Sequence, residues 1–301
     1  MSGRKGSFNE RNDKSLKLQN IYVRDPYILF FEGMYYLYSK VALDAKEFVV
    51  YKSEDMETWS GPKVVFRPAE GFWGQRDFWA PEVHIYNGKF YMFASFKSDI
   101  ACRGTHILKA DAPDGDFAPI SDTPITPREW EALDGTLYID NNGEPHLVFC
   151  HEWGQIGDGT VCEMKLSEDL TRAVTAPRVL WSASDYSGSV NAAKDNRLSL
   201  VTDGPCLFKS KNGGLCCTWS TMGESGYLVC LSKSDNGDID GEWHVQQEPL
   251  FSGNGGHGMV FRNPSGERCF VMHKPNIHPL ERASIYILKE REDGFVLEGG
   301  E

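Results

Sequence analysis

A chain of 301 residues can form one large β domain or two ordinary domains, and 41% hydrophobic residues are sufficient for a substantial core. The formal net charge is −12 and no Lys/Arg-rich run follows Arg4-Lys5, so binding to nucleic acid through its phosphates is not expected. The longest apolar stretches are short and interrupted by charges, so we expect neither a membrane-spanning helix nor a membrane partner.

The first residues are polar and charged without periodicity, and we expect residues 1–16 to form a flexible segment. No apolar stretch typical of a secretory signal precedes the first predicted strand. The eight cysteines include no C-x-x-C pair, which favours free thiols in a reducing compartment. Unless a signal has been trimmed from the sequence, these features predict a cytoplasmic protein.

One module, a β-hairpin followed by a third strand, recurs five times along the chain. Its clearest copy has strands at 82–86 and 89–93 around Asn87-Gly88, a strong type I′ turn signal. The other hairpins are predicted at 27–31 with 34–38, 136–139 with 145–149, 205–209 with 215–219, and 259–262 with 268–273. The third strands are predicted at 48–52, 105–109, 161–165, 227–231 and 285–289.

The spacing of these modules indicates the architecture. The turn glycines Gly33, Gly88, Gly143, Gly213 and Gly266 recur roughly every 55 to 70 residues, which suits propeller blades of three or four antiparallel strands. A β-sandwich would also give many short strands, but the repeated turn position favours a propeller. Helix signals are almost absent. We therefore predict an all-β fold, a single five-bladed β-propeller over residues 17–301.

Residues with catalytic potential stand at one position of the module. Counting back eight to ten residues from each turn glycine gives Asp25, Ala80, Asp134, Asp203 and His257. Equivalent strands of a propeller begin at one end of its central channel, so these side chains are expected to converge. Three carboxyl groups in one cleft cannot all ionise cheaply, which raises at least one pKa. Glycoside hydrolysis needs such a pair, one carboxyl group protonated and another ionised.

The same residues carry a family resemblance. The sequence resembles the five blades of glycoside hydrolase family 43 at Arg24-Asp25-Pro26, Trp79-Ala80-Pro81-Glu82, Asp134-Gly135, Asp203-Gly204-Pro205 and Gly256-His257-Gly258. The resemblance covers about residues 20 to 290 and implies an inverting glycosidase. By motif position it implies that Asp25 is the general base, that Asp134 tunes and orients the acid, and that Asp203 is the general acid.

The fourth motif departs from the family pattern, which has Glu where this sequence has Asp203. The shorter side chain must reach the glycosidic oxygen from a closer backbone or through a water, and proton transfer depends steeply on position. Three explanations stay open: a subfamily with a shorter acid, an acid supplied elsewhere, for which Glu224 is the nearest substitute, or a catalytically inactive carbohydrate-binding propeller.

Other residues are expected around an oligosaccharide substrate. Candidates for stacking on a sugar ring are Trp73, Trp79 and Trp153, and candidates for hydrogen bonds to its hydroxyls are Arg24, Glu82 and Arg262. His257 could contact the sugar or hold an ion. The resemblance implies calcium or sodium as that ion, in the central channel, and implies that no other cofactor is required.

The hypothesis from the sequence is an inverting, exo-acting glycosidase that removes pentose or furanose units, of the α-L-arabinofuranosidase or β-D-xylosidase type. Arg24-Asp25-Pro26 also resembles the opening of fructan-cleaving five-bladed hydrolases, which retain configuration. Their Asn-Asp-Pro-Asn-Gly and Glu-Cys motifs are missing from this sequence. The sequence makes no prediction of the oligomeric state.

Overall fold

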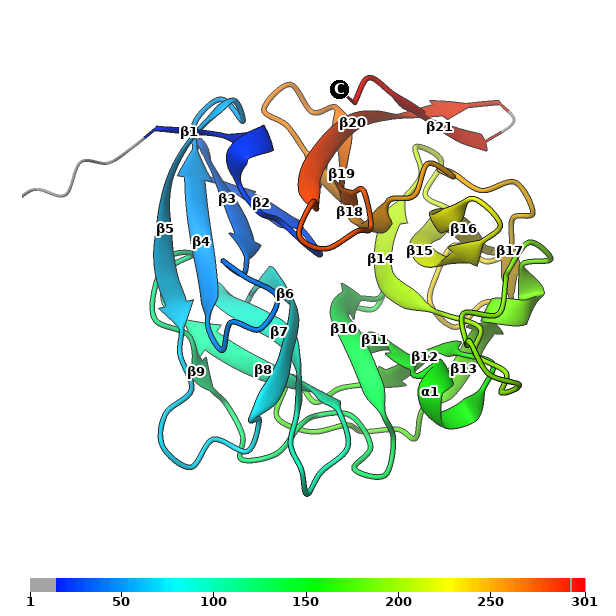
Figure 1. Cartoon of the computed structure of the whole chain (residues 1–301), viewed down its shortest axis with the longest axis horizontal. Coiled ribbons are helices and arrows are strands. Elements are labelled where there is room, and N and C mark those ends of the chain that lie inside the picture. Colours follow the sequence, from blue (N-terminus) through cyan, green and yellow to red (C-terminus); the bar gives the residue numbers. More distant parts are fainter. Residues whose placement is uncertain (1–14, 293, 301) are drawn as a thin grey trace, which may run out of the picture.

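Five antiparallel sheets are arranged in a ring (Figure 1), which confirms the predicted five-bladed propeller. This computed structural model describes residues 15–292 and 294–300. Residues 1–14 of the predicted flexible segment lie outside the described residues, whereas Leu16 at its end belongs to a short strand. The division of the chain at residue 16 stays a prediction.

Each sheet is one blade, built from strands that follow one another in the chain. The first blade has β1 (Leu16–Lys17), β2 (Tyr27–Phe31), β3 (Met34–Ser39), β4 (Phe48–Ser53) and β5 (Thr58–Phe66). The second has β6 (Arg76–Tyr86), β7 (Lys89–Lys97), β8 (Gly104–Ala110) and β9 (Ala118–Pro119). The third has β10 (Ala132–Ile139), β11 (Pro145–His151), β12 (Thr160–Lys165) and β13 (Arg178–Ser182).

The last two blades repeat this order. The fourth has β14 (Asp203–Lys209), β15 (Leu215–Gly223), β16 (Gly226–Ser234) and β17 (Trp243–Val245). The fifth has β18 (Gly256–Arg262), β19 (Arg268–Lys274), β20 (Arg282–Arg291) and β21 (Gly294–Glu298). Helical structure in the described residues is limited to single turns, at Leu18–Asn20, at α1 (Trp153–Ile156) and at Ala183–Asp185.

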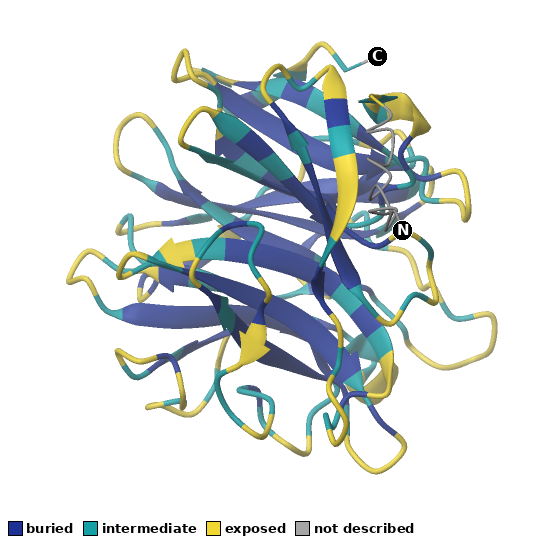
Figure 2. Cartoon of the chain, turned by 90° about the vertical axis from the view of Figure 1, so that its left-hand side faces the viewer, coloured by how far each residue is buried: buried dark blue, intermediate teal, exposed yellow. Residues whose placement is uncertain are grey.

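The core lies between neighbouring blades, where strands with two apolar faces meet. Phe48 and Phe66 of the first blade pack against Phe78 and Phe96 of the second, with ring centroids 5.7 to 6.3 Å apart. Figure 2 shows buried residues along the strands and exposed residues mainly in the loops that join them. This packing fixes the blades, and with them the residues at the starts of the inner strands.

The ring is closed where the segment before β2 meets the fifth blade. The Val23 N–H donates to the Glu281 carbonyl (3.3 Å), and Arg282 Nε donates to the Gln19 carbonyl (3.0 Å). Both contacts join residues from opposite ends of the chain, which brings the first inner strand next to the last blade. No helix among the described residues is both long and apolar enough to cross a bilayer.

Candidate active site

The first strand of every blade carries the same backbone distortion near its start. A residue near or just before the start of each first strand has a positive φ angle, namely Asp25 (52°), Ala80 (45°), Asp134 (55°), Gly204 (51°) and His257 (47°), and β6 has a second such residue at Asp77 (55°). In β6, β10, β14 and β18 the pairing with the next strand is interrupted at this point, as in a β-bulge. We call these five residues the inner ring, because the bulge repeats around the propeller axis.

The inner ring corrects one part of the sequence reasoning. In the fourth blade its member is Gly204, so Asp203 occupies the preceding position, which we call the outer ring and which holds Arg24, Trp79, Leu133, Asp203 and Gly256. A Cβ atom on Gly204 would lie 2.7 Å from His257 Cδ2. The imidazole therefore fills the space of an inner-ring side chain in this blade, and the carboxyl group comes from one residue earlier.

Both rings contribute to a cavity of about 340 Å³ at this end of the propeller. The cavity is lined by Arg24, Asp25, Lys40, Leu43, Trp79, Leu133, Asp134, Trp153, Asp203 and His257. The three aspartates proposed from the sequence thus face one space, together with the histidine. A volume of this size lies in the range of about 300–1,000 Å³ found for small-ligand sites.

His257 lies at the centre of the carboxyl groups. Its Nδ1 atom is 3.3 Å from Asp25 Oδ1 and 3.7 Å from Asp134 Oδ2, and its backbone N–H donates to Ser220 Oγ (2.8 Å). Burial lowers the pKa of His257, but the three aspartates outweigh it and raise the pKa above 6.5. The three carboxyl groups thus favour the imidazolium form of His257, whose positive charge offsets theirs.

Asp25 is the carboxyl group that stays ionised. Burial acts to raise its pKa, but His257 and then Arg24 outweigh burial and lower the pKa below 3.8. Arg24 Nε lies 3.8 Å from Asp25 Oδ2. The Asp25 backbone N–H donates to His273 Nδ1 (3.3 Å), and burial lowers the pKa of His273 to about 4, so this ring is a neutral acceptor.

Asp134 and Asp203 are the carboxyl groups that hold protons more tightly. Burial is the largest cause that raises the pKa of each above 3.8, and the charge of Asp25 adds to it. Asp134 Oδ2 accepts the N–H of Gly204 (3.0 Å), which fixes the backbone that follows Asp203. Tyr227 donates its hydroxyl proton to Asp203 Oδ2 (2.9 Å). The cavity thus contains one ionised carboxylate and a pair that can keep a proton.

The remaining predicted substrate-binding residues separate into two groups. Arg24, Trp79 and Trp153 line the cavity, with Trp153 in the single-turn helix α1. Glu82 is buried in β6 and does not line the cavity; its Oε2 atom lies 3.2 Å from His84 Nε2. Trp73 lines a different cavity, described below.

Arg262 is the one predicted substrate contact that lies at the opposite end of its strand. It is the last residue of β18, whereas His257 is near the first, and its Nη1 atom donates to the Gly266 carbonyl in the β18–β19 turn (2.8 Å). Glu224 is exposed in the β15–β16 turn and is absent from the cavity lining. We therefore remove Arg262 and Glu224 from the candidate site.

Sequence reasoning missed Lys40, Leu43 and Leu133, which also line the cavity. Lys40 follows β3 and donates from Nζ to the Leu43 carbonyl, and burial lowers its pKa to about 8. Its position at the same end of the blade as Asp25 was the available signal. Lys40 and Arg24 bring two basic side chains to the cavity that holds the three carboxyl groups.

The predicted cation at His257 stays a prediction. Calcium and sodium prefer oxygen ligands, and a single histidine would need waters to complete the coordination. Asp25 Oδ1 and Asp134 Oδ2 lie 3.3 and 3.7 Å from His257 Nδ1 and could offer oxygen ligands beside the ring. Side chains of this chain carry every catalytic step proposed below.

Comparisons with known proteins find one matching family model and several similar solved structures. A family model described as "Glycosyl hydrolases family 43" matches residues 19–294. The solved structure of an endo-arabinase from Bacteroides thetaiotaomicron superposes with a TM-score of 0.87 at 35% identity, covering 92% of this chain and 98% of that one. Another solved structure, called a thermostable family-43 glycoside hydrolase, has a TM-score of 0.78 at 24% identity, with coverages of 92% and 93%.

Two curated relatives carry names that refer to arabinan. One is the extracellular endo-α-(1→5)-L-arabinanase 1 of Bacillus subtilis, 26% identical over 46% of this chain and 46% of the relative. The other is the extracellular exo-α-(1→5)-L-arabinofuranosidase ArbA of Cellvibrio japonicus, 24% identical over 70% of this chain and 64% of the relative. The chain therefore spans about half to two thirds of the length of these relatives.

The names of these relatives contradict the predicted cytoplasmic location, which is wrong. All eight cysteines are free in the structure, as expected, but seven are buried. A buried cysteine behaves as a small apolar side chain that is shielded from oxidants and partners. The absence of disulfides therefore says little about the redox state of the surroundings.

Proposed function

Because the chain belongs to glycosyl hydrolase family 43, a family of glycosidases, we propose that it hydrolyses α-L-arabinofuranosyl linkages of oligosaccharides or polysaccharides with inversion of configuration. The observation that supports this most directly is the divergence of the pKa values of Asp25 and Asp203 in one cavity. Separated pKa values of neighbouring carboxyl groups are characteristic of a base and an acid that work together.

In the proposed reaction Asp25 is the general base and Asp203 the general acid. The ionised Asp25 takes a proton from a water, and the water oxygen forms a bond to the anomeric carbon. The bond from that carbon to the glycosidic oxygen breaks, while Asp203 gives its proton to the departing oxygen. Acid, base and water balance the reaction, so no organic cofactor takes part.

Asp134 and Tyr227 are proposed to position Asp203. Asp134 holds the N–H of Gly204, the residue after the acid, and Tyr227 holds one oxygen of its carboxyl group. These two contacts restrict the direction in which a short side chain can point, which is what an aspartate needs in place of a glutamate. These contacts favour Asp203 as an active general acid over the alternative of an inactive carbohydrate-binding propeller.

Attack at chain ends stays our proposal for the mode of action, since the cavity of about 340 Å³ offers room for only a short part of a chain. Internal cleavage is the second candidate, because the solved structure with 35% identity is named an endo-arabinase.

Hydrolysis of a panel of nitrophenyl glycosides tests the substrate class. We expect release from α-L-arabinofuranoside, with β-D-xyloside second and hexosides inactive. Exclusive release from a hexoside would overturn the proposed sugar. No release from nitrophenyl glycosides or from arabinan and xylan, together with calorimetric binding of their oligosaccharides, would establish the inactive binding propeller instead.

A further inference from the structure

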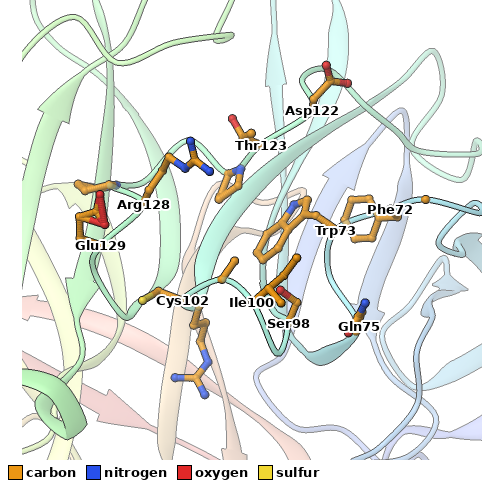
Figure 3. Close-up of a pocket in the computed structure, with 15 residues that line it drawn as sticks. Phe72, Trp73, Gln75, Ser98, Ile100, Cys102, Asp122, Thr123, Arg128 and Glu129 are labelled. Atoms are coloured by element: carbon orange, nitrogen blue, oxygen red, sulfur yellow. The ribbon is translucent and has the colours of Figure 1, made fainter.

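A second and larger cavity lies on the same face of the propeller as the three aspartates. It has a volume of about 720 Å³ and is formed by the segments 71–75, 98–103 and 122–129 (Figure 3). These segments precede β6, join β7 to β8 and precede β10, at the end where the inner strands begin. We call it the outer cavity. It lies beside the second blade, whereas the aspartates come from the first, third and fourth blades.

Trp73 provides an aromatic surface in the outer cavity and is held in one orientation. Its Nε1–H donates to His106 Nδ1 (3.0 Å), so that nitrogen is the acceptor and the ring proton is on Nε2. Burial lowers the pKa of His106 to about 4, which keeps the acceptor neutral. Phe72 and Phe96 pack against the indole, with centroids 6.1 and 6.2 Å away. Because the indole is already held in place, little side-chain entropy is lost when a ligand stacks on it.

Ser98 supplies a polar group without a partner in the outer cavity. The residue is 2% exposed, and its Oγ atom has no hydrogen-bond partner. An unpaired buried hydroxyl costs free energy that a ligand hydroxyl would recover. Ile100 nearby is 95% exposed, although it is a large apolar side chain. Figure 3 shows both side chains close to the Trp73 indole.

The charge of the lining favours a neutral ligand. The negative charges of Asp122 and Glu129 offset the positive charge of Arg128. The guanidinium of Arg103 is paired with Asp77 (2.8 Å) and Glu152. No free cluster of positive charge is present among the described lining residues to select a phosphate or a uronate. An aromatic face, an unpaired hydroxyl group and balanced charge together are typical of a carbohydrate site.

The outer cavity and the catalytic cavity share a wall. Arg103 lines the outer cavity, and its guanidinium carbon lies 4.1 Å from the ring centroid of Trp79, which lines the cavity of the aspartates. The Arg103 side chain is buried, so the Arg103–Trp79 stack is part of the wall between the two cavities. A saccharide that leaves the catalytic cavity past Trp79 would reach the outer cavity on the other side of this wall.

We propose that the outer cavity is a second carbohydrate-binding site, which holds distal pentose units of the same saccharide chain whose reacting linkage lies among Asp25, Asp134 and Asp203. The inference rests on the proposed function for the identity of the sugar. It predicts that long substrates bind more tightly than short ones, because only long chains reach Trp73.

Trp73→Ala and Ser98→Ala test this in two assays. For arabinan, Trp73→Ala should raise KM about tenfold and Ser98→Ala about fivefold with kcat nearly unchanged, whereas kcat/KM for nitrophenyl α-L-arabinofuranoside should stay within about twofold. Trp73→Phe, which keeps a stacking face, should recover most of the loss. Equal losses on both substrates, or no loss on either, would overturn the outer site, and thermal melting controls for misfolding.

Direct binding separates this inference from the proposed function. Arabinan-derived oligosaccharides are titrated calorimetrically into Asp25→Asn protein and into the double variant Asp25→Asn/Trp73→Ala. A Kd about tenfold higher in the double variant supports the outer site, even if the wild type hydrolyses no arabinofuranoside and the proposed function fails. The same Kd in both proteins, or no binding to either, contradicts the outer site whatever the wild type hydrolyses.

Discussion

At the scale of single residues, the balance of charge around His257 decides which carboxyl group can act as a base. Asp25 contacts the imidazolium and Arg24, so it keeps its charge despite burial. Asp203 contacts neither cation directly and receives a neutral hydroxyl from Tyr227, so burial dominates and its pKa rises. The two roles thus follow from which partners each side chain can reach.

Replacing Asp25 by Asn removes the base and should lower kcat/KM for arabinofuranosides by about 10³-fold. The amide has nearly the same shape, so the fold should be retained, as checked by near-ultraviolet circular dichroism. A loss of less than tenfold in a folded variant would show that the base lies elsewhere.

The pH dependence of kcat/KM follows from the two shifted groups. Activity requires Asp25 ionised and Asp203 protonated, so it should rise as pH passes the lowered pKa of Asp25 and fall as pH passes the raised pKa of Asp203. The Tyr227 hydroxyl favours the ionised form of Asp203. Tyr227→Phe should therefore raise that pKa further and move the alkaline limb up by about 0.5–1 pH unit. An alkaline limb that stays in place, or moves to lower pH, would show that this limb does not report the ionisation of Asp203.

The residue scale is also where sequence reasoning reached its limit. Asp25, Asp134 and His257 were placed correctly in the repeat, but Asp203 stands one position early, because the imidazole of His257 fills the space beside Gly204. That constraint comes from a neighbouring blade, and its mark in the local sequence is the glycine at position 204. Trp73 was grouped with the substrate-binding residues from its aromatic type and its place in a loop between strands, and only the fold shows that it lines another cavity.

At the scale of elements, the hairpins could be predicted to within a few residues, because turn glycines and alternating apolar residues are local signals. The outermost strand of each blade was not predicted, and β13 (Arg178–Ser182) lies in the third module, where no aromatic residue marks the turn after β12. Its Trp181 is buried against Trp219 and Trp243 of the next blade, a contact that depends on the closed ring. Outer strands with few residues have little periodicity to detect.

The bulge at Gly204 gives a prediction at this scale. Gly204→Ala should destabilise the protein by about 2–4 kcal/mol, because a Cβ atom adds overlap with the His257 ring to the strain of a positive φ angle. Gly213→Ala is the matched control, with φ of 83° and open space around the added atom, and should cost only about 1 kcal/mol. Chemical denaturation measures both, and equal losses would mean that the His257 contact is not tight.

At the scale of the whole molecule, two cavities on one face connect the fold to the mode of action. A chain end in the catalytic cavity with distal units in the outer cavity would release one sugar at a time. Chromatography of early arabinan digests should therefore show arabinose as the first product. A ladder of oligosaccharides at the same stage would replace the exo mode by internal cleavage.

The central claim is that Asp203, despite its short side chain, is the general acid. The most direct test is whether the rate lost on removing its carboxyl group depends on the leaving group of the substrate. Rates of Asp203→Ala and wild type are compared on arabinotriose and on dinitrophenyl α-L-arabinofuranoside, whose leaving group departs without a proton. The variant should lose about 10³-fold on arabinotriose and less than about tenfold on the activated substrate. Equal losses on both substrates, or full activity on arabinotriose, would contradict the assignment of Asp203 as the acid.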